Sequence, residues 1–316
     1  MTNQTAPTAG MSLINWLLLL FLSLLWGGSF FFNGVALQEI PVLTVVFSRV
    51  FLAALTLMLV LRIKGITFPM DKNILFAFMV MGLLNNLIPF YLIVSGQTMI
   101  SSGLASVLNA TTPLFTALVA HFLSGEESER LGPRRIAGIL CGIGGVAILL
   151  GPSIGAVGFT GDQVIGQLAV LAATLSYGFG VVYTRKVSQT GLTPLVTATG
   201  QVTATSVMML PLILLVDQPW TFMGNISGYI FLALGGLAVL STALAYLVYF
   251  HLIGSAGSTN ASLVTLVIPV SAILLGSLFL SEDVTPQMVL GMLVIALGLL
   301  IIDGRILRRF KQKSPA

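Results

Sequence analysis

The sequence predicts an all-α polytopic membrane protein, with ten transmembrane helices arranged as two inverted five-helix repeats around a central cavity. Three observations support this. The 316 residues are 56% hydrophobic and 8% charged, where a soluble domain carries about 25% charged residues. Apolar runs long enough for a bilayer, which takes ~20 residues, recur along the whole chain. Motifs of the first half return in the second. This composition excludes a soluble enzyme, a nucleic-acid binder and a disordered chain.

The first span follows a short N-terminus, residues 1–12, which is expected to be disordered. The uncharged run from Leu13 to Gln38 is too long for the core of a signal peptide, and no basic residue precedes it. Apolar runs and helix breakers then place the ten spans at 13–34, 41–62, 73–94, 102–123, 134–151, 164–186, 194–216, 226–249, 258–280 and 286–304. The connections are short, such as LQEI before Pro41 and the Gly-rich GPSIGAVGFTGDQ after the fifth span.

The charged residues predict the orientation of the chain. Thirteen of the 14 basic residues fall on one side of the ten-span arrangement: Arg62, Lys64, Lys72, Arg130, Arg134, Arg135, Arg185, Lys186, Arg305, Arg308, Arg309, Lys311 and Lys313. The other side carries only acids, namely Glu39, Asp162, Asp217, Glu282 and Asp283. The positive-inside rule therefore predicts that both termini, including the basic tail, are cytoplasmic.

An internal repeat divides the chain at residue 151, giving halves at 1–151 and 152–316. The segment GLASVLNATTPLFTALVAHFLSGEE from Gly103 resembles STNASLVTLVIPVSAILLGSLFLSED from Ser258, and Pro113 aligns with Pro269. Five spans per copy is an odd number, so the second copy must cross the membrane in the opposite direction. Inverted repeats are typical of alternating-access transporters, whose substrate site lies near the midplane.

Several motifs resemble those of EamA-type drug/metabolite transporters, over essentially the whole chain. They are WG in the first span (Trp26), P-x7-R from Pro41 to Arg49, and N-x3-P and T-x3-P in the fourth and ninth spans, which end in FLSGEE and FLSED. Within that superfamily the chain looks most like YddG-type bacterial amino-acid exporters of the inner membrane. The resemblance implies export of aromatic and other neutral amino acids through one central cavity. The second half departs from the pattern, with Val202 in place of Arg49.

Arg49 is the only formal charge predicted well inside a span. A charge at the bilayer centre costs at least ~2.5–3.5 kcal/mol, so its side chain must face protein or water. It could attract the carboxylate of a substrate, or it could lock the helices together by binding backbone carbonyls. Snorkelling towards the outer surface is a third alternative.

Other intramembrane residues are candidates for the site. Pro89, Pro113 and Pro269 each free the carbonyl four residues earlier, so a helix kink is expected at each. Polar and aromatic side chains within the spans could bind a zwitterion and its side chain, although each could equally serve only to hold helices together. The candidate substrate-binding residues are Trp26, Asn85, Tyr91, Asn109, Tyr177, Gln201, Tyr246 and Asn260.

Missing motifs also shape the prediction. Cys141, His121 and His251 have no metal-ligand spacing, and there is no P-loop, so no metal, cofactor or ATP is expected. No carboxylate lies deep in a span, which favours a facilitative carrier driven by its substrate gradient. The alternatives are a carrier of drugs or other metabolites and, from a different class, an intramembrane enzyme, for which no catalytic group is evident.

The expected partners are amino acids and the lipid bilayer. Gly138 and Gly142 form a GxxxG pattern that could pack helices in a monomer, which is favoured, or form a homodimer seam.

Overall fold

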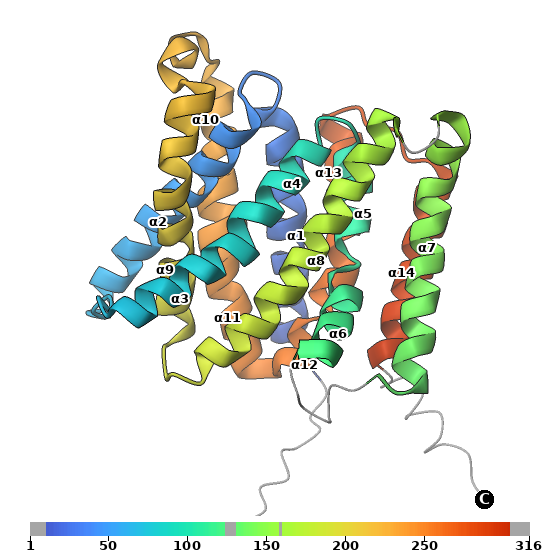
Figure 1. Cartoon of the computed structure of the whole chain (residues 1–316), viewed down its shortest axis with the longest axis horizontal. Coiled ribbons are helices and arrows are strands. Elements are labelled where there is room, and N and C mark those ends of the chain that lie inside the picture. The colour runs from blue at the N-terminus through green and yellow to red at the C-terminus, as the bar shows by residue number, and fades with distance from the viewer. Residues whose placement is uncertain (1–10, 124–130, 158–159, 304–316) are drawn as a thin grey trace, which may run out of the picture.

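The computed structural model describes residues 11–123, 131–157 and 160–303, and every regular element in these ranges is helical (Figure 1). The first half contains α1 (Leu13–Ala36), α2 (Val42–Ile63), α3 (Lys72–Gly82), η1 (Leu83–Leu87), α4 (Ile88–Gly96), α5 (Ser102–Asn109), α6 (Thr112–Leu123) and α7 (Pro133–Val157). The second half contains α8 (Asp162–Ser188), α9 (Pro194–Leu212), η4 (Ile213–Asp217), η5 (Pro219–Thr221), η6 (Met223–Asn225), α10 (Gly228–Gly235), η7 (Gly236–Leu244), α11 (Ala245–Ala256), α12 (Ser258–Ala261), α13 (Val264–Phe279) and α14 (Pro286–Asp303).

Nine helical runs of the described chain are long and apolar enough to cross a membrane. The remaining predicted span, 258–280, is divided into the short α12 and the 16-residue α13. Among the described residues the predicted polytopic, all-helical fold is thus confirmed. The residues around Arg130, the basic tail from Arg305 and most of residues 1–12 lie outside the described residues.

Two predicted boundaries were wrong. The Gly-rich connection begins later than expected, because α7 continues through Pro152 to Val157. Ser153 Oγ lies 3.2 Å from Gln163 Oε1 and 3.2 Å from Gln167 Nε2, which fixes this extra helical segment against α8. The eighth span is longer than predicted and ends at Ala256.

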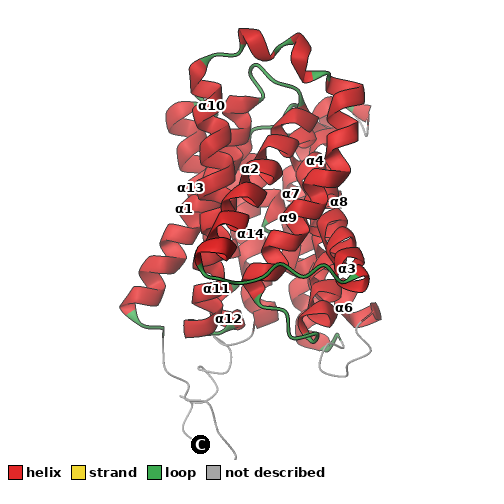
Figure 2. Ribbon diagram, turned by 90° about the vertical axis from the view of Figure 1, so that its left-hand side faces the viewer, coloured by secondary structure: helices red, strands yellow, loops and turns green. Residues whose placement is uncertain are grey.

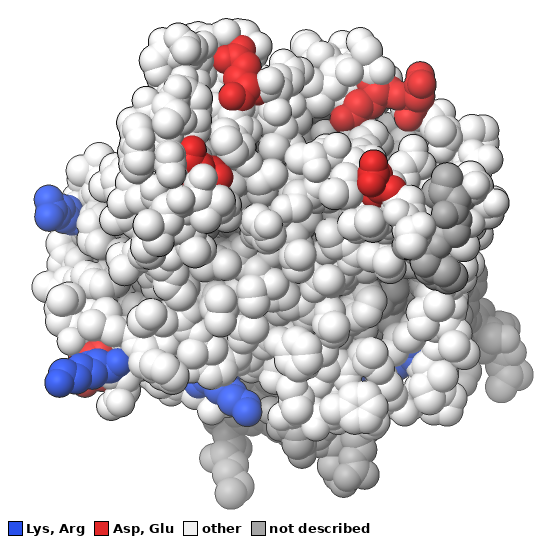
Figure 3. All heavy atoms as spheres, turned by 45° about the horizontal axis from the view of Figure 1, so that its top comes forward, with Lys and Arg blue, Asp and Glu red and all other residues white. Residues whose placement is uncertain are grey.

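The two halves run in opposite directions. The α1–α2, α4–α5, α9–α10 and α13–α14 connections lie at one end of the molecule, and the α2–α3 and α8–α9 connections lie at the other (Figures 1 and 2). Glu39, Asp217 and Glu282 belong to the first end, which we call the acidic end; Arg62 and Arg185 belong to the opposite, basic end. Figure 3 shows this separation, with most of the visible acidic side chains at the upper end and the basic ones mostly toward the lower edge.

The helix contacts repeat between the halves. α1 packs against α13, and α8, which holds the place of α1 in the second half, packs against α6. In the same way α2 packs against η7 and α9 packs against α3, while α2 with α9 and α7 with α14 form pairs of equivalent helices. These main contacts across the two halves therefore have inverted counterparts, as the predicted inverted repeat requires.

Glycines allow α7 and α14 to pack closely. A Cβ atom on Gly138 would lie 2.6 Å from the carbonyl oxygen of Gly298, and one on Gly145 would lie 3.0 Å from that of Gly291. The small-residue face predicted from Gly138 and Gly142 is thus covered within the chain, so it is not a free surface for a homodimer.

We expect Gly145→Ala to destabilise this helix pair while the neighbouring Gly144→Ala does not. The new Cβ at position 145 would lie 2.9 Å from the backbone nitrogen of Ile295, whereas no atom lies within 4 Å of a Cβ at position 144. Overpacking of this kind costs about 1–3 kcal/mol. Thermal unfolding of the two purified variants in the same detergent measures the difference, and equal melting temperatures would contradict the close packing.

The three prolines have different local effects. The fourth span is interrupted directly before Pro113, between Asn109 and Thr112, as predicted. Pro89 follows the π-helical η1, where the wider turn absorbs the lost hydrogen bond. The kink expected at Pro269 is not a break, because α13 runs through this residue; the interruption lies earlier, at residues 262–263.

Candidate functional site

A chain of hydrogen-bonded polar side chains crosses the interior between the two halves. Asn85 Nδ2 donates to Thr184 Oγ1 at 3.0 Å and to Gln201 Oε1 at 3.4 Å. Gln201 Nε2 donates to the Tyr246 hydroxyl at 3.1 Å, and that hydroxyl lies 3.4 Å from Asn86 Oδ1. We call these five residues, with Arg49, Tyr177, Thr205 and Thr242, the central polar cluster.

Arg49 of α2 is the only cation of the cluster. Its side chain is 7% exposed, its Nε donates to Thr242 Oγ1 at 3.0 Å, and its Cζ lies 3.8 Å from the centre of the Phe90 ring. No carboxylate of the described chain pairs with it, and none of the described residues accepts a hydrogen bond from its two terminal nitrogens. A cation–π contact and one neutral acceptor therefore hold the guanidinium, and its terminal donors remain available for an anion.

The neighbours of Arg49 come from α4, α8 and α11. Phe90 supplies the ring under the guanidinium, and the hydroxyls of Tyr177 and Tyr246 are near enough to interact with it electrostatically. Gly180 leaves room for Asn85, because a Cβ there would lie 2.7 Å from Asn85 Cγ. One charge, aromatic faces and neutral donors and acceptors thus meet at a single place.

Two π-helical segments, η1 and η7, bring the polar residues to this place. They occupy equivalent positions in the two halves, and π-helical turns frequently occur at functional sites. Asn86 in η1 and Thr242 in η7 stand at the same repeat offset as Pro113 and Pro269. Asn86 Nδ2 donates to Thr205 Oγ1 at 3.4 Å, which mirrors the bond from Arg49 to Thr242.

The residue of the second half that corresponds to Arg49 is Thr205, and not Val202 as the sequence had suggested. Thr205 bonds to Asn86 in the same way that Arg49 bonds to Thr242 in the other half. Val202 is fully buried among apolar residues instead. The site is still asymmetric, because only one of the two equivalent positions is charged.

The structure brings Arg49 together with four of the predicted binding residues: Asn85, Tyr177, Gln201 and Tyr246. The substrate-binding residues chosen from the sequence do not include five residues of the site: Phe90, Asn86, Thr184, Thr205 and Thr242. The repeat offset is a signal that could have found some of them, because it pairs Phe90 with Tyr246 and Asn86 with Thr242.

The other four predicted binding residues do not join the cluster. Tyr91 is 41% exposed and faces out of the helix bundle, so it is not part of this site. Trp26 packs on Tyr249 with ring centres 5.1 Å apart, and Asn260 Nδ2 donates to the backbone carbonyl oxygen of Ala256, the last residue of α11. Asn109 lies at the break between α5 and α6, where its buried Oδ1 has no hydrogen-bond partner among the described residues.

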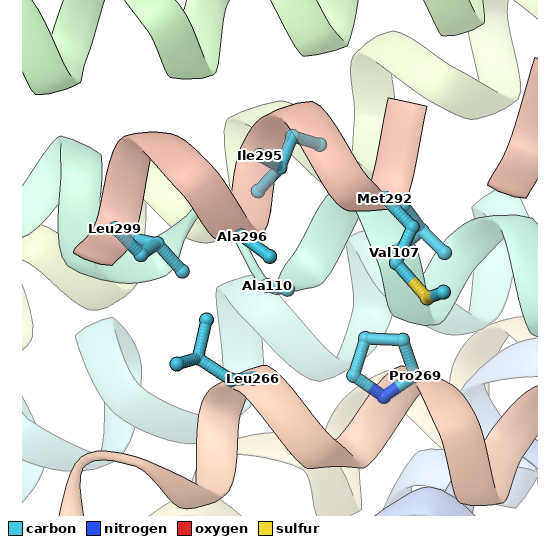
Figure 4. Close-up of a pocket in the computed structure, with 8 residues that line it drawn as sticks. All are labelled: Val107, Ala110, Leu266, Pro269, Met292, Ile295, Ala296 and Leu299. Carbon is cyan, nitrogen blue, oxygen red and sulfur yellow. The ribbon is translucent and has the colours of Figure 1, made fainter. Parts of the chain in front are cut away.

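Two cavities lie away from the cluster. A small one of about 10 Å³ lies where α5, α13 and α14 meet, with the Pro269 ring and only apolar side chains around it (Figure 4). A larger groove of about 400 Å³ lies near the acidic end between α1, α10 and α13. Its lining contains no charged side chain, so neither cavity offers the combination of groups found at Arg49.

Comparisons with known proteins agree with this architecture. The model of the EamA-like transporter family matches residues 14–151 and again residues 164–303. The uncharacterized transporter YoaV of Bacillus subtilis (strain 168) is 28% identical over 286 residues, covering 88% of this chain and 92% of YoaV. The uncharacterized inner membrane transporter YedA of Escherichia coli (strain K12) is 26% identical over 285 residues, covering 89% of this chain and 88% of YedA.

A more distant relative and a solved structure extend the similarity. Protein PecM of Dickeya dadantii (strain 3937) is 26% identical over 260 residues, covering 79% of this chain and 83% of PecM. One protein crystal structure has the same fold at a TM-score of 0.65 and 19% identity, covering 94% of this chain and 98% of that one. Because the family model matches most of the sequence, twice in succession, the chain belongs to the EamA-like transporter family.

Proposed function

We propose that this protein exports amino acids, aromatic and other neutral ones, across the inner membrane by alternating access. Its family is a transporter family, and the finer assignment rests on one observation: Arg49 is a buried cation without an acidic partner in the described chain. A guanidinium binds a carboxylate through two parallel hydrogen bonds, which an amino acid can satisfy at one end. The carboxylate in turn would compensate a charge that is costly in the membrane interior.

The rest of the cluster suits the other parts of an amino acid. The oxygens of Asn86, Gln201 and Tyr246 can accept hydrogen bonds from an ammonium group, which is a donor only. The Phe90 ring lies under the guanidinium, and Tyr177 packs against the same apolar cluster as Phe90, so these rings can provide flat apolar faces for a planar side chain. Trp26, Asn109 and Asn260 remain candidates for contacts in a different conformation of the carrier.

The proposed orientation and coupling follow from the charges. Both termini are cytoplasmic if the basic end faces the cytoplasm, as the positive-inside rule requires. The cluster contains no carboxylate that could relay a proton, so the substrate gradient itself would drive export. We expect a monomer, since α7 and α14 cover each other's glycine faces.

Counterflow into proteoliposomes tests the proposed substrate. Vesicles preloaded with phenylalanine should accumulate labelled phenylalanine and threonine, and an imposed pH gradient should not change the rate. Phenethylamine, which lacks only the carboxylate, should compete at least about tenfold more weakly, because the site's charge then has no partner. Accumulation of a cationic dye with no amino-acid counterflow would contradict the assignment and favour a carrier of drugs.

A further inference from the structure

Three carboxylates at the acidic end bind helix N-termini of the opposite half of the protein. They are Glu39, between α1 and α2; Asp217, at the end of η4; and Glu282, between α13 and α14. We call them the capping carboxylates. The first N–H groups of a helix have no partner within the helix, so a carboxylate placed there forms charge-assisted bonds and also interacts favourably with the helix dipole.

Glu282 makes the most complete of these contacts. Its Oε1 accepts from the backbone N–H of Ser102 at 2.8 Å, and its Oε2 accepts from that of Gly103 at 3.0 Å. Ser102 and Gly103 are the first two residues of α5, in the other half of the chain. Both carboxylate oxygens are therefore used to join the α13–α14 loop to the start of the fourth span.

Glu39 and Asp217 join the halves at two other helix N-termini of this end. Glu39 Oε2 accepts from the Ser227 N–H at 2.7 Å, and its Oε1 accepts from the Tyr229 hydroxyl at 2.7 Å, at the start of α10. The bonds from Ser227 lower the pKa of the Glu39 carboxyl below its usual value, so the ionised form is the one held. Asp217 Oδ2 accepts from both the N–H and the hydroxyl of Thr44, at 2.8 and 2.7 Å, in the first turn of α2.

These contacts join the two halves in addition to capping single helices. Each carboxylate stands in one half and each helix N-terminus in the other, so none of the bonds can persist if the halves separate at this end. At the basic end, by contrast, Asp71 caps α3, the helix that directly follows it.

We propose that Glu39, Asp217 and Glu282 hold the acidic end closed and must release their helix N-termini each time the carrier opens there. The inference rests on the alternating access proposed above. It predicts a conformational equilibrium in which the three carboxylates stabilise the closed arrangement, independently of which substrate is carried. Removing their acceptor oxygens should shift that equilibrium toward the open arrangement.

Spin-label distances in the purified protein test the proposal. On a Cys141→Ala background, one label pair replaces Gln38 and Asn225, and another replaces Met99 and Val284; all four residues are exposed and each pair joins the two halves at the acidic end. The test variant is Glu39→Gln with Glu282→Gln. An amide keeps the size of the side chain but carries no charge, and its NH₂ group cannot accept. Glu282→Gln therefore loses one of its two bonds to backbone N–H groups, and Glu39→Gln loses the charge assistance of both of its bonds, because the Tyr229 hydroxyl can turn and accept from the amide.

Matched controls are available at the same end. Asp283→Asn changes the residue next to Glu282, and Asp162→Asn changes another acid of this end; neither side chain has a hydrogen bond or ion pair with a described residue. We expect the longer-distance population to grow by more than about threefold in the double variant, as loss of charge-assisted bonds requires, and to stay unchanged in both controls. If the double variant does not fold, Glu282→Gln alone carries the same expectation for the Met99–Val284 pair.

The outcomes separate this proposal from the one on substrate. Unchanged distances in the glutamine variants, or equal changes in the asparagine controls, would overturn the closing role of the capping carboxylates. The distances are measured without substrate, so a failure of amino-acid counterflow would leave this result in place. A change of distances would likewise say nothing in favour of amino acids.

Discussion

Replacing Arg49 with methionine should lower amino-acid counterflow by at least about 30-fold while leaving the protein as stable as the wild type. Loss of one partner of a buried, hydrogen-bonded charge pair costs about 2–5 kcal/mol, which corresponds to that factor or more. The stability should not fall, because Arg49 has no carboxylate partner in the described chain and a charge in the membrane interior costs ~2.5–3.5 kcal/mol. Methionine keeps much of the apolar length that packs beside Phe90.

Thermal unfolding with and without substrate distinguishes carboxylate binding from helix locking as the role of Arg49. If it binds the carboxylate, phenylalanine should raise the melting temperature of the wild type but not of Arg49→Met. If it only locks the helices, the melting temperature without substrate should fall and counterflow should persist in the folded fraction. That second result would refute the proposed carboxylate site.

Two further variants refine the measurement. Arg49→Lys keeps a charge but loses the planar pair of donors, so counterflow should lie between the wild type and Arg49→Met. Thr242→Val removes the acceptor of Nε and leaves the terminal nitrogens in place, so its effect should be smaller than that of Arg49→Met.

The sequence alone predicted both the membrane spans and the importance of Arg49, and the apolar character of the bilayer is the reason in both cases. A bilayer requires long apolar helices whatever their neighbours are, so length and composition predicted most of the spans. Against that background a single arginine or glutamine is conspicuous. Asn85 does bind Gln201 in the structure, and all three predicted residues, Arg49, Asn85 and Gln201, belong to the central polar cluster. These predictions needed no knowledge of how the helices are rotated.

The aromatic residues show what the sequence alone could not predict. Phe90 and Tyr91 are adjacent, and one residue along a helix turns the side chain by about 100°. The rotation of α4 therefore decides that Phe90 meets Arg49 while Tyr91 faces outward. The π-helical η1 just before them changes that rotation, and π-helical turns depend on tertiary packing more than on composition. The sequence alone therefore could not show that Phe90, and not Tyr91, packs against Arg49 of the central polar cluster.

The adjacent glycines of the WGG motif should respond very differently to alanine, although both are buried in α1. A Cβ on Gly27 would lie 2.9 Å from the backbone nitrogen of Ala272 and 3.0 Å from the carbonyl oxygen of Ile268, and it would also meet Ser271 Oγ. Backbone atoms of α13 cannot move aside by a change of rotamer, so Gly27→Ala must displace α13 itself. On Gly28, the nearest atom would be Ser241 Oγ at 3.7 Å, which is an ordinary contact.

We therefore expect Gly27→Ala to cost about 1–3 kcal/mol and Gly28→Ala to stay within about 0.5 kcal/mol of the wild type. The loss at Gly27 should extend to counterflow, because α1 and α13 belong to different halves and form one of the main contacts between them. Melting temperatures and counterflow of the two variants, measured side by side, check both expectations. A stable, active Gly27→Ala protein would mean that α1 and α13 do not approach each other this closely in the membrane, and that the halves meet elsewhere.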